Sequence, residues 1–201
     1  MAFTNLQQVD EDDLNNFSPS GNVSIGGTLS VTGATTVAAL TASGIITASA
    51  GKIAFPAAQS ASADANTLDD YEEGNWTPVI GGTGGTSGQT YGTQTGKYVK
   101  IGKFVIAEFD VTLTAAGTIT TNPMVGGLPF TVETTVGGTA CSRWENLAAG
   151  VGMVGLEPVT GTTYARLTYT NNFVTSVLDM PTSHITNTTR LRGTILYRAS
   201  A

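Results

Sequence analysis

Residues 104–113 begin with four apolar residues, and from Ala107 onward apolar and polar residues alternate regularly. Phe109, Val111 and Leu113 fall on one face of this run, as expected for a half-buried β-strand, whose side chains point alternately to its two faces. A second apolar run at 98–101 precedes it, and a Gly-Lys pair separates the two. A short Gly-containing connection between two such runs predicts a β-hairpin.

Similar alternation, interrupted by turn signals, continues to the C-terminus. Gly, Pro and Asn mark the turns, because their backbones suit the dihedral angles that tight turns require. Further strands are expected at residues 131–135, 151–156, 164–169, 174–178 and 192–198. Seven or eight short strands at this spacing predict an all-β knob over residues 76–201, built as a β-sandwich or jelly roll.

A shorter pattern repeats within residues 21–54. Each copy has one apolar residue before and one after a Ser or Thr. A glycine follows two positions after the second apolar residue. This alternation gives a short strand with one apolar face, and the glycine permits the turn that follows. The apolar positions of the copies include Val23, Ile25, Leu29, Val31 and Leu40.

Each copy offers few and small apolar side chains, which cannot bury a core alone, because isolated two-stranded pieces are marginal in water. Repeats of this kind become stable by stacking on neighbours, either along one chain or between chains. The copies are too few for a single-chain solenoid, so we expect three chains to wind together around a common axis. Residues 21–54 are therefore predicted to form the β-stalk of a homotrimer.

Residues 1–20 form a separate piece. An acidic run lies among scattered apolar residues, which are Phe3, Leu6, Val9, Leu14 and Phe17. A segment of this size cannot offset its own ordering entropy. It is expected either to become ordered against another protein, as an anchoring peptide, or to be a frayed terminus. Residues 55–75, rich in Ala and Ser, are expected to form a connector, and the charge balance changes from acidic to slightly basic at its end.

Composition narrows the classes of function. Charged residues make up only 12% of the chain, hydrophobic residues make up 40%, and there are 25 glycines. The hydrophobic fraction argues against disorder, and the abundance of Thr and Gly argues against helices. No cluster of Lys or Arg occurs, so nucleic acid is not an expected partner. The N-terminus lacks the pattern of a signal peptide, and no run of about 18 apolar residues predicts membrane insertion.

Two parts of the sequence resemble proteins of tailed bacteriophages. The phrase GNVSIGGTLSVTGATTV resembles the strand repeats of tail fibres and related appendages. The phrases LDDYEEGNWTPVI, GKYVKIGKFVIAEFDVTLT and LRGTILYRA resemble a C-terminal module of such proteins, in which a strand-rich domain follows an LDDYEEG-W-TP motif. The resemblance covers roughly residues 20–201.

This resemblance implies a homotrimeric virion fibre, made in the cytoplasm of the host bacterium. Its N-terminus is expected to dock on another virion structural protein, with the tail favoured, and its distal knob to attach to a host surface glycan or protein. Many tail fibres are far longer than this chain. A head (capsid) fibre or decoration protein with an adhesive role is therefore the alternative.

The sequence predicts no catalytic, cofactor or metal site. His184, the only histidine, lacks a nucleophile motif and is expected at the surface. The acids within residues 69–73 are expected to be solvated, rather than to form the carboxylate pair of a glycosidase. The Gly-rich residues 81–88 lack the Gly-Lys-Ser end of a phosphate-binding loop and are expected to form a flexible loop. Cys141, the only cysteine, is expected to be buried.

Binding needs only a shaped surface, and aromatic rings beside amides and hydroxyls suit contacts with glycan or protein. The candidates for receptor contact are Tyr91, Trp144, Asn171 and Asn172. A place for Trp144 in the core is an equally good interpretation. Two other classes stay open besides a structural and adhesive fibre: a compact polysaccharide-degrading enzyme, and a monomeric carbohydrate-binding module of a secreted bacterial protein.

Overall fold

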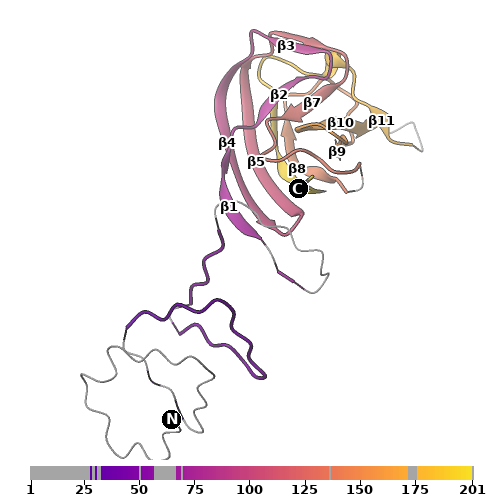
Figure 1. Cartoon of the computed structure of the whole chain (residues 1–201). Coiled ribbons are helices and arrows are strands. Elements are labelled where there is room, and N and C mark those ends of the chain that lie inside the picture. Colours follow the sequence, from indigo (N-terminus) through magenta and orange to yellow (C-terminus); the bar gives the residue numbers. More distant parts are fainter. Residues whose placement is uncertain are drawn as a thin grey trace, which may run out of the picture. The chain divides into compact units, whose positions relative to one another are not determined.

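The computed structural model describes residues 28, 30, 33–49, 51–56, 67, 68, 70–135, 137–171 and 176–200 (Figure 1). The chain divides into two units, Met1–Gly51 and Lys52–Ala201. All of the described strands belong to the second unit. We refer to residues 70–200 as the C-terminal domain.

The described part of the C-terminal domain contains twelve strands and one short 3-10 helix. The strands are β1 (Tyr71–Trp76), β2 (Val79–Gly82), β3 (Gly85–Ser87), β4 (Thr90–Ile101), β5 (Phe104–Ala115), β6 (Thr118–Thr120), β7 (Pro123–Gly126), β8 (Thr139–Glu145), β9 (Met153–Pro158), β10 (Tyr164–Thr170), β11 (Leu178–Asp179) and β12 (Arg190–Arg198). The helix is η1 (Thr182–His184).

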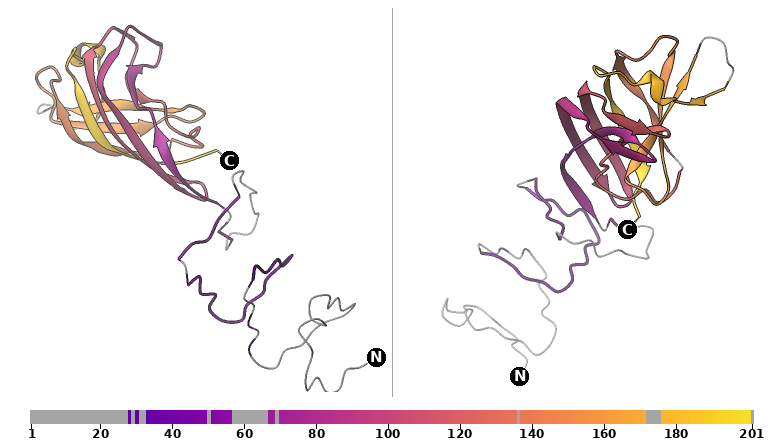
Figure 2. Two further views of the ribbon diagram at one scale, coloured as in Figure 1. Left: turned by 90° about the vertical axis from the view of Figure 1, so that its left-hand side faces the viewer. Right: turned by 90° about the horizontal axis from the view of Figure 1, so that it is seen from above.

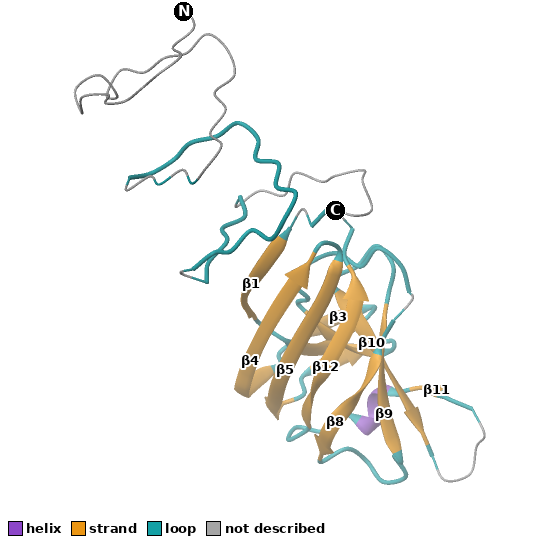
Figure 3. Cartoon of the chain, turned by 90° about the horizontal axis from the view of Figure 1, so that it is seen from below, coloured by secondary structure: helices purple, strands orange, loops and turns teal. Residues whose placement is uncertain are grey.

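Most strands lie on one antiparallel path, which has two halves. Sheet A has the order β1-β4-β5-β12-β8, and Figure 3 shows these strands side by side. Sheet B has the order β8-β9-β10-β7-β2, with β11 paired to β10. Strand β8 belongs to both halves. The remaining strands, β3 and β6, pair with each other in a small separate sheet.

Strand β8 is the corner at which the path bends. Its first two residues, Thr139 and Ala140, pair with β9, whereas its later residues pair with β12. The pairing with β12 shifts register between Arg192 and Gly193, which leaves Ser142 as the extra residue of a bulge. A bulge bends its strand and increases the local twist. As a result, sheets A and B lie face to face as two layers (Figure 2).

The inward side chains of both layers form one core. Phe109 and Leu191 reach it from sheet A, and Ile80, Val125 and Leu167 reach it from sheet B; all five are 4% exposed or less. These positions alternate with exposed or half-buried ones along each strand, as expected for a two-layer β structure. The all-β prediction is confirmed. The strand order, in which β8, β9 and β10 follow one another as a meander, does not confirm jelly-roll connectivity.

The predicted hairpin at 98–101 and 104–113 is confirmed as β4 and β5, both longer than expected. The predictions at 164–169 and 192–198 correspond to β10 and β12, and β9 begins two residues after the start expected from the sequence. No strand forms at 131–135, where a single bridge joins Val132 to Ala199. Residues 172–175 lie outside the described residues, so only the end of the run at 174–178 can be compared, and there β11 begins at Leu178.

The Gly-rich residues 81–88 are strands and a turn, and the prediction of a flexible loop was wrong. Strand β3 pairs with β6, with Thr86 opposite Ile119. The Thr86 hydroxyl also accepts a hydrogen bond of 3.0 Å from the backbone N–H of Gly82. Glycine allows this tight packing, because a Cβ on Gly82 would lie 2.2 Å from the carbonyl oxygen of Thr120. Close backbone approach explains Gly82, and positive φ angles of 147° and 77° explain Gly85 and Gly88.

The LDDYEEGNWTP motif forms an edge strand of the C-terminal domain. Strand β1 pairs with β4 from Tyr71 to Trp76, so the last residues of the predicted connector at 55–75 lie within sheet A. The carboxylate of Asp70 forms an ion pair with Lys100, and both residues are 5% exposed or less. The Asp70 carbonyl also accepts a 3.0 Å hydrogen bond from the N–H of Gly102. Sheet A therefore includes residues 71–76, which begin upstream of the predicted start of the knob at residue 76.

Trp76 closes this end of the core. Its indole Nε1–H lies 3.0 Å from the carbonyl oxygen of Glu108 and 3.2 Å from that of Lys97. The ring packs edge-on against Phe109, with 6.3 Å between the centroids. It also fills the space above Gly96, where a Cβ would lie 2.6 Å from Nε1. The tryptophan of the motif thus joins β1 to β4 and β5.

In the first unit, the described residues of the predicted stalk form no strand. Leu40 is 66% exposed, and Val37, Ile45 and Ile46 are more than half exposed in the single chain. The repeat positions Val23, Ile25, Leu29 and Val31 lie outside the described residues, as do all five predicted anchor residues within residues 1–20.

Candidate functional site: the outer face of sheet A

The outer face of sheet A presents its side chains in rows that cross the strands, because paired residues point to the same side. The two rows nearest the β4–β5 turn are mostly apolar, and we call their apolar members the apolar rows. They consist of Tyr71, Ile101 and Phe104 in the first row, and Val99, Ile106 and Leu196 in the second. The three side chains of the first row are 43–48% exposed, although solvent-facing positions of a sheet are usually polar.

The remaining rows are polar and charged. Asp110 accepts two hydrogen bonds from Arg190, one of 3.0 Å from Nε and one of 2.7 Å from Nη2. Arg192 lies 3.8 Å from the same carboxylate. Glu145 continues the network, since it pairs with Arg143 and lies 3.8 Å from Arg190. The hydrogen bonds from Arg190 lower the pKa of Asp110, against the opposing effect of its burial.

This network predicts a dependence of stability on pH. Because the pKa of Asp110 is lowered on folding, its stabilising effect is fully present above the ordinary value of 3.8 and is lost as the pH falls through the lowered value. We expect the thermal midpoint to fall below about pH 4. Calorimetry of the wild type and of Asp110→Asn tests this expectation: the variant should be less stable at neutral pH and should show a shallower acid slope. Equal slopes would contradict the assignment to Asp110.

Two hollows lie on this face, between the apolar rows and the charged rows. One has a volume of about 280 Å³ and is lined by Thr95, Asp110 and Arg192, among others. The other has a volume of about 600 Å³ and lies toward β1. Lys97 and Glu108 line both hollows and face each other in register across β4 and β5. Among the described residues, neither side chain has an ion pair within 4 Å.

The residues predicted for receptor contact are spread over separate elements. The Tyr91 hydroxyl, on β4, donates a 3.2 Å hydrogen bond to the carbonyl of Ile80, and burial raises its pKa. Trp144, on β8, is half-buried and packs against the core, in agreement with the alternative interpretation. Asn171 follows β10 and is half-buried, and Asn172 lies outside the described residues. Tyr91 and Trp144 therefore have structural contacts, and receptor contact stays a prediction for all four.

His184 and Cys141 take part in packing. His184 was expected at the surface, but it is half-buried, because the turn η1 places its ring 4.9 Å from that of Tyr169. Cys141 is 4% exposed, as expected, and burial raises the pKa of its thiol to about 12. Within the described residues, no group of three or more His, Cys, Asp or Glu side chains is arranged to hold a metal ion. The described residues also include no helix with the length and hydrophobicity needed to span a membrane.

Comparison with known proteins finds a similar fold. No protein-family model and no curated protein matches the sequence. Among solved structures, the crystal structure of the Dettilon tailspike protein is similar, with a TM-score of 0.50 and 17% identity. The match covers 64% of this chain and 24% of the tailspike chain, so the matched part corresponds to about a quarter of that protein. At this identity the similarity shows a shared fold.

Proposed function

We propose that the protein is a structural, non-enzymatic fibre of a bacteriophage particle, attached to the tail through residues 1–20. The similarity to a tailspike protein supports this proposal, because 64% of this chain shares a fold with part of that protein. The sequence resemblance to phage fibres, which covers the repeats and the LDDYEEGNWTP motif, points to the same class. The C-terminal domain is then the distal part, which faces the host surface.

A homotrimer is part of the proposal, and exposed apolar side chains support it. Val37, Leu40, Ile45, Ile46 and Ile53 are 56–94% exposed in the single chain. So many exposed large apolar residues within so short a segment need a partner surface. Two further copies of the same segment supply that surface, since the repeated pattern offers each chain the same small apolar face.

Electron microscopy of the phage particle tests the attachment. A particle whose copy of this chain carries a C-terminal tag is labelled with antibody and gold. We expect gold at the tail, at the outer end of a thin projection. Gold on the capsid would instead assign the protein to the head fibres, the alternative named above. Gold found only on unassembled protein would contradict a virion function.

A host-adsorption assay tests the attachment role separately. Purified protein, added before the phage, is expected to slow adsorption by competing for the host surface. The variant Asn171→Ala, at a residue predicted for receptor contact, is the comparison and is expected to compete less strongly. If a large excess of wild-type protein does not change adsorption, the attachment role is contradicted. The protein would then have a purely structural role on the particle.

A further inference from the structure

We propose that the outer face of sheet A is the contact surface between neighbouring copies of the C-terminal domain, with a second copy of this chain as its occupant. This inference rests on the proposed trimer. In each contact, β1 and the apolar rows of one copy pack against the β12–β8 side of the next copy.

The apolar rows are the first argument. Tyr71, Ile101 and Phe104 are register partners across β1, β4 and β5, so their exposed surfaces form one continuous patch. Val99 and Ile106 extend it toward the 600 Å³ hollow, which they line. Scattered apolar side chains on a surface are ordinary, but a contiguous patch beside a hollow is typical of a contact surface.

The distribution of charge is the second argument. Strand β1, at one edge of sheet A, carries Glu73 on the outer face, opposite Val99, and no cation. On the opposite side, Arg192 and Arg198 on β12 and Arg143 on β8 are more than half exposed, and each also lies within 4 Å of a carboxylate of its own chain. A threefold ring requires two different surfaces to meet, one from each copy. Contact of β1 with the β12–β8 side of the next copy brings an acidic residue against basic ones.

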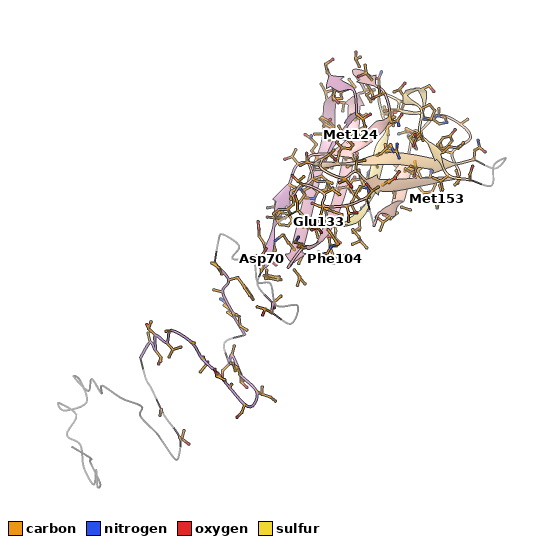
Figure 4. The ribbon with its side chains drawn as sticks, turned by 45° about the vertical axis from the view of Figure 1, so that its right-hand side comes forward. Asp70, Phe104, Met124, Glu133 and Met153 are labelled. Carbon is orange, nitrogen blue, oxygen red and sulfur yellow. The ribbon has the colours of Figure 1, made fainter. Side chains whose placement is uncertain are left out.

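The path of the chain is the third argument. Tyr71 directly follows Asp70, at the point where the chain enters the domain, and Figure 4 shows Phe104 at the same end of the domain as Asp70. Chains that are joined upstream of residue 70 hold this end of each domain near its neighbours. The apolar rows therefore lie where contact between copies is most readily made, whereas Met153, on β9, lies elsewhere on the domain (Figure 4).

Cysteine labelling of the full-length protein tests this surface. Cys141 is 4% exposed and has a raised pKa, so the wild type provides a low background for maleimide. Phe104→Cys places a thiol in the apolar rows, and Met153→Cys is the matched control. The two native side chains have nearly equal exposure in the single chain, 45% and 42%. Each variant is labelled in its native state and in urea, and its mass in solution is measured by light scattering.

We expect native Phe104→Cys to react about tenfold more slowly than Met153→Cys, and the two to react equally in urea. Loss of the trimer in Phe104→Cys alone would also support the proposal, because the substitution would then have weakened the contact. Equal native rates in trimeric variants would overturn this surface and leave the proposed fibre intact. A monomeric wild type would overturn the proposed trimer, and this inference with it.

Discussion

Replacement of Trp76 by alanine is expected to lower the free energy of unfolding of the C-terminal domain by about 3–5 kcal/mol. The substitution leaves a cavity beside Phe109 and removes both indole hydrogen bonds, to the carbonyls of Lys97 and Glu108. Because these contacts join β1 to β4 and β5, the edge strand should also be lost early in unfolding. Urea denaturation followed by circular dichroism gives the free energy.

Trp144→Ala is the matched control for this substitution. Its ring is half-buried, whereas Trp76 is 8% exposed, so truncation removes less buried surface. We expect Trp144→Ala to lower the free energy of unfolding by less than half as much as Trp76→Ala does. A larger cost for Trp144→Ala would show that the core is centred on β8, and would contradict the role given to the LDDYEEGNWTP motif.

Removal of either member of the buried ion pair between Asp70 and Lys100 is expected to lower the free energy of unfolding by about 3–5 kcal/mol. Both residues are 5% exposed or less, so Lys100→Met leaves a carboxylate in the interior without its ammonium partner. Asp70→Leu removes the carboxylate from beside the buried ammonium and should have a similar effect. Two buried charges cost desolvation energy, and their mutual attraction offsets part of it.

The double variant Asp70→Leu, Lys100→Met distinguishes the pair from its two members. Apolar residues of similar size often replace a buried ion pair at little cost. We therefore expect the double variant to be more stable than either single variant, as a double-mutant cycle from urea denaturation would show. If the losses of stability from the two single substitutions simply add in the double variant, Asp70 and Lys100 do not stabilise the domain as a pair.

Local patterns predicted the parts of the fold that depend on neighbouring residues. The hairpin of β4 and β5 could be identified because an apolar run and an alternating run are separated by only two residues, Gly102 and Lys103. The pairing of β1 into sheet A was not predicted, because Asp70 and the acids of β1 are typical of a solvated connector. Their burial and pairing depend on Lys100 and on the free edge of β4, which are distant in sequence.

In the candidate site, too, local patterns predicted some features, and others depend on residues that are distant in sequence. Alternation along β5 and β12 predicts which residues face outward on each strand, but not that the two strands are neighbours. Arg190 and Asp110 are 80 positions apart, and their contact follows from the order of strands in sheet A. The apolar rows carried a signal that could have been used: Ile101 and Phe104 stand at outward positions of an otherwise polar face, on either side of the predicted turn.

Light scattering of the full-length protein after size exclusion is the most direct test of the account. In the proposed fibre, three copies of the chain cover one another's exposed apolar segments. We predict a single species of about 62 kDa, three times the 20.6 kDa of the chain, that persists on dilution. A stable monomer of 20.6 kDa would contradict the fibre, since the exposed side chains of residues 37–53 would then have no partner chain.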